Sequence, residues 1–63
     1  PLYPKLLYAV FKERMNGKTY KEIYSLYQAG SLKYFLGGES TIFKSEDELE
    51  KYYRSHTPQA PTV

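Results

Sequence analysis

Aromatic side chains most constrain what this sequence can fold into. The chain has 63 residues and no cysteine, so neither a disulfide framework nor a thiolate zinc site can hold it together. A chain this short buries only about 60% of its unfolded surface, and its core must therefore be efficient. Eight tyrosines and three phenylalanines can supply such a core, because each aromatic ring buries a large area and a tyrosine can keep its hydroxyl in water. We predict one domain with most of its tyrosines in the core or at its rim.

The composition argues against several classes of function. No apolar stretch approaches the roughly 20 residues of a membrane-spanning helix, and the absence of cysteine fits a reducing compartment. The single histidine, His56, cannot form a metal site alone. No phosphate-binding spacing surrounds Gly37-Gly38, the only glycine pair. We therefore expect a cytoplasmic protein with no enzymatic activity, cofactor, metal, small-molecule substrate or membrane partner.

Charge is distributed unevenly along the chain. Residues 1–44 carry seven basic and three acidic side chains, a net charge of +4. Residues 45–63 carry two basic and four acidic side chains, a net charge of −2. A basic body with an acidic last helix indicates that one face is turned toward an anionic partner.

The first helix is predicted over residues 4–15. Pro4 lies in the first turn, where a helix tolerates proline, and Asn16-Gly17 supplies the left-handed residue that ends it. Its large apolar side chains follow the i, i+3, i+4 spacing of one buried stripe. The expected stripe consists of Tyr3, Leu6, Leu7, Val10, Phe11 and Met15.

A capping box predicts the start of the second helix. In it, the Thr19 hydroxyl and the Glu22 carboxylate each accept a hydrogen bond from an otherwise unpaired backbone N–H. Gly30 is expected to end this helix near residue 28 or 29. The apolar stripe of the second helix consists of Tyr20, Ile23, Tyr24 and Tyr27. We expect it to face the core.

Residues 31–44 are compatible with two structures. Alternating apolar residues up to Leu36, a turn at Gly37-Gly38 and a β-branched and aromatic run over residues 41–43 indicate a short β-hairpin. Alternatively, Ser31 caps a two-turn helix that ends after Leu36. We prefer the hairpin.

A second capping box, Ser45 with Glu48, predicts the last helix. Its apolar stripe contains Leu49, Tyr52 and Tyr53. Residues 1–56 are thus predicted to form a single helical domain. The polar, proline-containing residues 57–63 are predicted to be a disordered tail or linker.

Two helices joined by the tight turn Asn16-Gly17-Lys18 form the skeleton of a helix-turn-helix. When the stripe of the second helix faces the core, Lys21, Ser25 and Gln28 project outward together. These residue types contact phosphates or base edges, which predicts duplex DNA as the partner. The expected DNA-binding residues are Lys18, Lys21, Ser25, Gln28, Ser31, Lys33 and Lys44.

Two segments resemble known DNA-binding domains. The run GSLKYFLGGESTIFKSEDELEKYY, residues 30–53, resembles the wing and final helix of excisionase-like and MerR-like winged helix-turn-helix domains. The run GKTYKEI, residues 17–23, is similar to the start of helix-turn-helix units in recombinases and regulators. The resemblance implies a mainly α fold of three helices with a small β-hairpin as the wing. It also implies a DNA-binding module of a regulator, recombination or partition factor.

Two alternatives remain open at this point. The fold could be an all-α bundle of three or four helices without a wing. The function could be that of a tyrosine-rich protein-interaction domain from a larger protein, or of a homodimer, since interfaces favour tyrosine surrounded by a polar rim.

Overall fold

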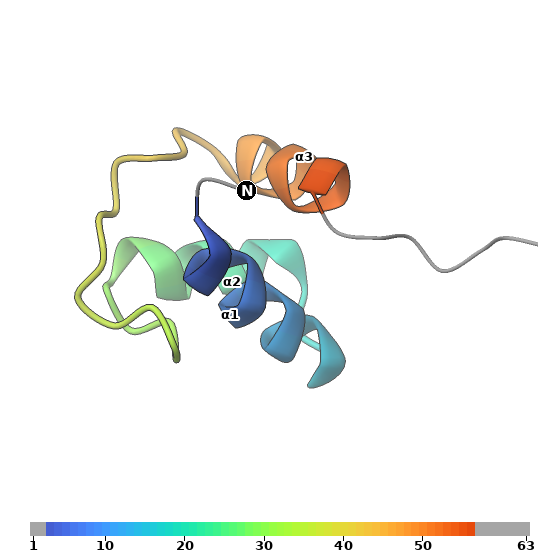
Figure 1. The fold of residues 1–63 in the computed structure, drawn as a ribbon, viewed down its shortest axis with the longest axis horizontal. Coiled ribbons are helices and arrows are strands. Elements are labelled where there is room, and N and C mark those ends of the chain that lie inside the picture. Colours follow the sequence, from blue (N-terminus) through green and yellow to red (C-terminus); the bar gives the residue numbers. More distant parts are fainter. Residues whose placement is uncertain (1–2, 57–63) are drawn as a thin grey trace, which may run out of the picture.

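A computed structural model of the chain describes residues 3–56, which form three α-helices (Figure 1). Helix α1 spans Pro4–Met15, α2 spans Tyr20–Gln28 and α3 spans Glu46–His56. Each helix contacts the other two, and an irregular loop connects α2 to α3. The expectation of a mainly helical fold with three helices is confirmed. The tail predicted for residues 57–63 lies outside the described residues.

Two glycines end α1 and α2 in the same way. Gly17 and Gly30 have φ angles of 85° and 71°, in the left-handed region that favours glycine. The N–H groups of Gly17 and Lys18 donate to carbonyls in the last turns of α1, at 2.9 and 3.1 Å. Those of Gly30 and Ser31 do the same for α2, at 3.1 and 2.9 Å. Both glycines thus form the Schellman motif, which stops a helix and pairs its last carbonyls.

Side-chain caps begin α2 and α3. At α2 the predicted capping box is complete: the Glu22 N–H donates to the Thr19 hydroxyl (3.1 Å), and the Thr19 N–H donates to the Glu22 carboxylate (2.8 Å). At α3 the Glu48 N–H donates to the Ser45 hydroxyl (3.3 Å). The Glu48 carboxylate, however, accepts from the Lys44 N–H (3.2 Å), one residue further back than a capping box requires.

Helix α1 buries only part of the predicted stripe: Leu6 and Val10 are in the core and Tyr3 packs against it. The side chains of Phe11 and Met15, expected in the core, are 40% and 66% exposed. The residues of α1 that are buried are Leu6, Ala9, Val10 and Glu13. Ala9 explains the rotation, because a methyl side chain at a helix contact allows the neighbouring elements to approach closely. A pattern built from large apolar side chains overlooks such a position.

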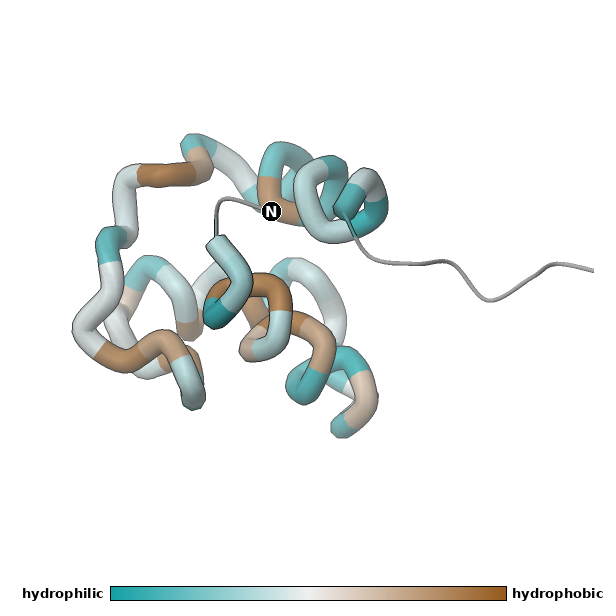
Figure 2. The backbone as a smooth tube through the Cα atoms, in the orientation of Figure 1, coloured by the Kyte–Doolittle hydropathy of each residue, from teal (hydrophilic) through white to brown (hydrophobic). Residues whose placement is uncertain are grey.

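The core joins all three helices and the loop. Hydrophobic segments of α1, α3 and the loop, brown in Figure 2, contribute side chains to it. The buried apolar residues are Leu6, Ala9, Val10, Ile23, Tyr27, Leu32, Phe43 and Leu49. Five further tyrosines pack against this core while partly exposed: Tyr3, Tyr20, Tyr24, Tyr52 and Tyr53. The prediction that most tyrosines lie in the core or at its rim is confirmed.

Residues 31–44 form neither the predicted hairpin nor the alternative helix. Within the described residues 3–56 there is no β-strand, and this segment consists of turns and bends. The Phe35 N–H donates to the Leu32 carbonyl (3.0 Å) and the Gly38 N–H to the Phe35 carbonyl (3.1 Å). Tyr34, with φ 72°, adopts a left-handed conformation within the first of these two turns. The N–H and carbonyl groups that a hairpin would pair between its two strands are therefore hydrogen-bonded within local turns.

The second half of the loop pairs with tyrosine hydroxyls of α2. The Tyr27 hydroxyl accepts from the N–H groups of Ile42 (2.8 Å) and Phe43 (3.4 Å). The Tyr24 hydroxyl donates to the Phe43 carbonyl (3.3 Å). Buried backbone groups must find partners, and these two side chains provide them where a neighbouring strand was expected.

We predict that Tyr27→Phe lowers the free energy of unfolding by about 1–3 kcal/mol, because it leaves the Ile42 and Phe43 N–H groups without an acceptor. Urea denaturation followed by circular dichroism measures this loss. Tyr8→Phe is the matched control, because Tyr8 is 48% exposed and does not belong to the hydrophobic core cluster. A Tyr27→Phe variant as stable as the control would contradict the role of this hydroxyl.

Candidate functional site

The outward face of α2 is the face that the sequence predicted. Ile23 and Tyr27 are buried, so the opposite side of the helix points to solvent. Lys21, Ser25 and Gln28 are all exposed. The capping box at Thr19 and the left-handed glycine after α2 fix both ends of this helix. The positions of its polar side chains are therefore set by a helix with defined ends.

A shallow hollow of about 440 Å³ lies along this face. It begins at the turn before α2 and extends to Ser31, the last residue of the Schellman motif. Its lining residues are Lys18, Lys21, Glu22, Ser25, Leu26, Ala29 and Ser31. Four of the seven predicted site residues thus line one concave surface: Lys18, Lys21, Ser25 and Ser31.

The other three predicted residues do not line this hollow. The side chain of Gln28 is turned toward the loop side of α2, where its Nε2 donates to the Tyr24 hydroxyl (3.3 Å). Lys33 and Lys44 are exposed on the loop, outside the lining of the hollow. Gln28 is therefore exposed like Lys21 and Ser25, but it does not line the hollow with them.

Three lining residues were missed by the sequence reasoning. Glu22, Leu26 and Ala29 lie beside the predicted residues at helical spacing. This spacing could have identified them from the sequence, because positions 18, 22, 25 and 29 are separated by three or four residues, as on one face of a helix. Leu26 and Ala29 add apolar side chains to the lining of the hollow.

The contacts of two arginines with the Tyr20 ring at the start of α2 were also missed. The guanidinium carbon of Arg14, on α1, lies 4.4 Å from the centre of the Tyr20 ring, and that of Arg54, on α3, lies 5.9 Å from it. Arg14 Nη1 also donates to the Lys18 carbonyl (2.8 Å). Cation–π contacts of this kind hold a guanidinium in place without neutralising it. Arg14 therefore adds positive charge near Lys18, whereas Arg54 is paired with Glu50, whose carboxylate oxygen lies 3.0 Å from its Nε.

One carboxylate borders the hollow. The pKa of Glu22 is lowered from its usual value, first by the Thr19 backbone N–H that donates to it, then by the Thr19 hydroxyl, with a further contribution from nearby Lys18. The Glu22 carboxylate is therefore ionised at neutral pH. It accepts hydrogen bonds from the N–H and the hydroxyl of Thr19 in the helix cap.

Other kinds of site are not found in the described part of the chain. Residues 3–56 contain no group of three histidine, cysteine or acidic side chains placed to hold a metal ion. None of the three described helices is long and apolar enough to cross a membrane.

Comparisons with known proteins do not identify a family for this chain. The chain matches no protein-family model, no curated protein and no solved structure.

We predict that Glu22→Gln destabilises the protein at neutral pH but not in acid. The folded-state pKa of Glu22 lies below the unfolded value, so the ionised carboxylate stabilises the folded protein. This stabilisation is fully present above the usual glutamate pKa of about 4.3 and is lost as the pH falls through the folded-state pKa. Urea denaturation of both proteins at neutral pH and below about pH 3 tests this. Glutamine keeps the capping geometry, so an equal stability difference at both pH values would exclude the charge as its cause.

Proposed function

We propose that this chain is a small DNA-binding module that places the outward face of α2 on duplex DNA. The observation that carries the proposal is the hollow lined by Lys18, Lys21, Ser25 and Ser31 on the second helix of a helix-turn-helix pair. A single exposed α-helix fits the major groove, which is about 12 Å wide. The resemblance of residues 17–23 to the start of helix-turn-helix units supports the same function, whereas residues 31–44 do not form the hairpin that a wing requires.

The side chains of this face have complementary roles in the proposal. Lys18 and Lys21 contact phosphates, aided by the positive end of the α2 dipole and by Arg14 beside it. Ser25 is placed in the middle of the face to contact a base edge or a sugar. Lys33 and Lys44 extend the positive charge onto the loop.

The small size of the module limits what it can read. Helix α2 has nine residues and presents only a few polar side chains to a groove. One such surface contacts few base pairs, so we expect a second copy or a second domain to supply specificity. This fits a role as part of a regulator, recombination or partition factor.

The test is a fluorescence anisotropy titration of labelled duplex DNA at about 50 and 200 mM salt. We expect modest affinity that falls steeply as salt rises, because exposed lysines dominate the contact. Replacing Lys21 by alanine should weaken binding on every duplex and lower the slope of log K against log salt by about 1.

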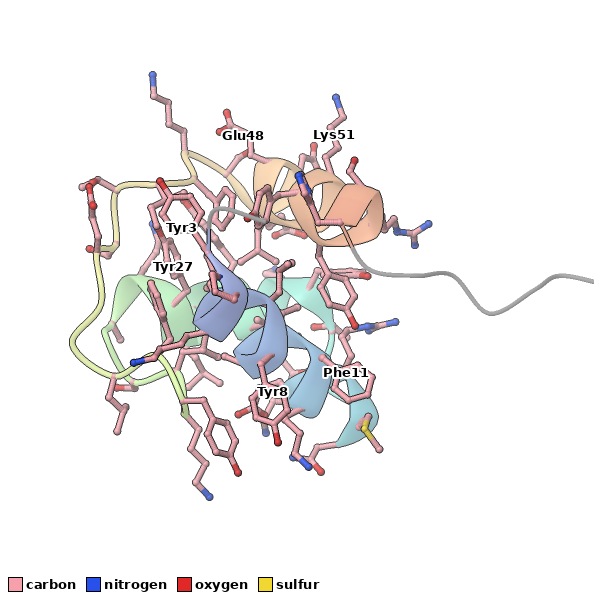
Figure 3. The ribbon with its side chains drawn as sticks, viewed as in Figure 1. Tyr3, Tyr8, Phe11, Tyr27, Glu48 and Lys51 are labelled. Carbon is pink, nitrogen blue, oxygen red and sulfur yellow. The ribbon has the colours of Figure 1, made fainter. Side chains whose placement is uncertain are left out.

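The matched control is Lys51→Ala, which removes the same charge from the outer side of α3 (Figure 3). It should bind DNA nearly as well as the parent protein, and both variants should keep the parent's melting temperature. Absence of binding at low salt, or an equal loss in both variants, would rule out the α2 face as the DNA site.

A further inference from the structure

Helix α1 carries a second apolar stripe that faces solvent. Tyr8, Phe11 and Met15 are 48%, 40% and 66% exposed. Their spacing of i, i+3 and i+7 puts them on one face of the helix. Figure 3 shows Tyr8 and Phe11 projecting from α1 on the side away from α3. Contiguous exposed rings and a thioether on one helix face are typical of an interaction surface.

The loop adds a fourth side chain to this stripe. The Tyr34 ring, 50% exposed, packs edge-on against the Tyr8 ring with 5.1 Å between the ring centres. Tyr34 does so from a left-handed backbone conformation (φ 72°), which is unfavourable for a bulky side chain. Pro4 and Lys5 line a shallow hollow together with the two rings. The stripe of Tyr8, Phe11, Met15 and Tyr34 is called the α1 surface below.

Positive charge surrounds the α1 surface. Lys5 is exposed beside Tyr8, and the Lys12 Nζ lies 6.0 Å from the centre of the Tyr8 ring. The only acidic residue of α1, Glu13, is turned into the protein and is 7% exposed. The α1 surface is therefore apolar with a basic rim, and no exposed acid from α1 balances that rim.

We propose that the α1 surface is the docking site for an acidic amphipathic helix of a partner protein. A helix laid along α1 would bury the stripe between its own apolar side chains, in the ridge-and-groove manner of packed helices. Acidic residues flanking those side chains would pair with Lys5 and Lys12. Charge complementarity of this kind selects the partner and its orientation.

Other occupants fit the surface less well. A second copy packed antiparallel through α1 would bring the two basic rims together. Residues 57–63 contain no acidic side chain to complement the rim. A single-stranded nucleic acid needs open ring faces on which its bases stack, whereas the Tyr8 and Tyr34 rings pack edge to face against each other.

The α1 surface is separate from the α2 face. None of its residues lines the hollow that contains Lys21 and Ser25. Docking at α1 can therefore be measured without DNA, and its outcome is independent of the function proposed for α2.

The probe is a fluorescently labelled synthetic peptide: an amphipathic helix with a leucine stripe flanked by glutamates. A second peptide has lysine at every glutamate position. We expect anisotropy to show saturable binding of the glutamate peptide and none of the lysine peptide. Phe11→Ser should weaken the binding about tenfold or more, because a central buried aromatic anchor is lost. The control Lys51→Ser, on α3, should change it little.

Circular dichroism melts serve to check that the Phe11→Ser protein is folded. We expect it to be folded, because Phe11 is 40% exposed. The proposal is overturned if neither peptide binds, if both bind equally or if Phe11→Ser binds as well as the parent. It is likewise overturned if the chain prefers phosphatidylserine vesicles or a single-stranded oligonucleotide to the glutamate peptide. Self-association in sedimentation equilibrium that Phe11→Ser abolishes would assign the surface to a second copy instead.

Discussion

The packing of Tyr27 is the interaction on which the path of the loop depends. Its ring is 2% exposed and contacts the rings of Tyr24, Phe35 and Phe43, at centre distances of 5.9, 6.2 and 5.6 Å. Its hydroxyl at the same time accepts the Ile42 N–H. One side chain of α2 therefore satisfies both the apolar and the polar needs of a segment that has no regular structure. Without a buried acceptor at this point, the loop would have to pair its backbone with itself or with water.

Features encoded by neighbouring residues could be predicted from the sequence. The Schellman motifs at Gly17 and Gly30 and the capping box at Thr19 each depend on side chains within a few positions of one another. Their physics is local: only a residue that tolerates positive φ ends a helix in this way, and only a short polar side chain accepts the first free N–H groups. For the same reason the outward direction of Lys21 and Ser25 followed from the buried positions of Ile23 and Tyr27.

Features that depend on distant partners could not be predicted in this way. The alternation of residues 31–44 suits a strand, but the hydroxyl that captures Ile42 lies 15 residues earlier, on a helix. Likewise, α1 offers two apolar stripes, and which one is buried depends on what α2, α3 and the loop bring to it. Gln28 shows the same limit within the candidate site: it is exposed as predicted, but Tyr24 draws its amide away from the hollow.

The distribution of acids gives the two proposed surfaces a common electrostatic basis. Glu13 is buried in α1 and Glu22 is the one acid of α2, whereas α3 carries four acidic side chains, Glu46, Asp47, Glu48 and Glu50. Basic side chains consequently outnumber acidic ones on the exposed part of α1 and over residues 18–28, which contain α2 and the turn before it. The resulting field would orient α2, rather than α3, toward DNA during approach. An acidic partner on α1 would reduce this field, and because exposed charges are screened over about 8 Å at physiological salt, such coupling between the surfaces would be strongest at low salt.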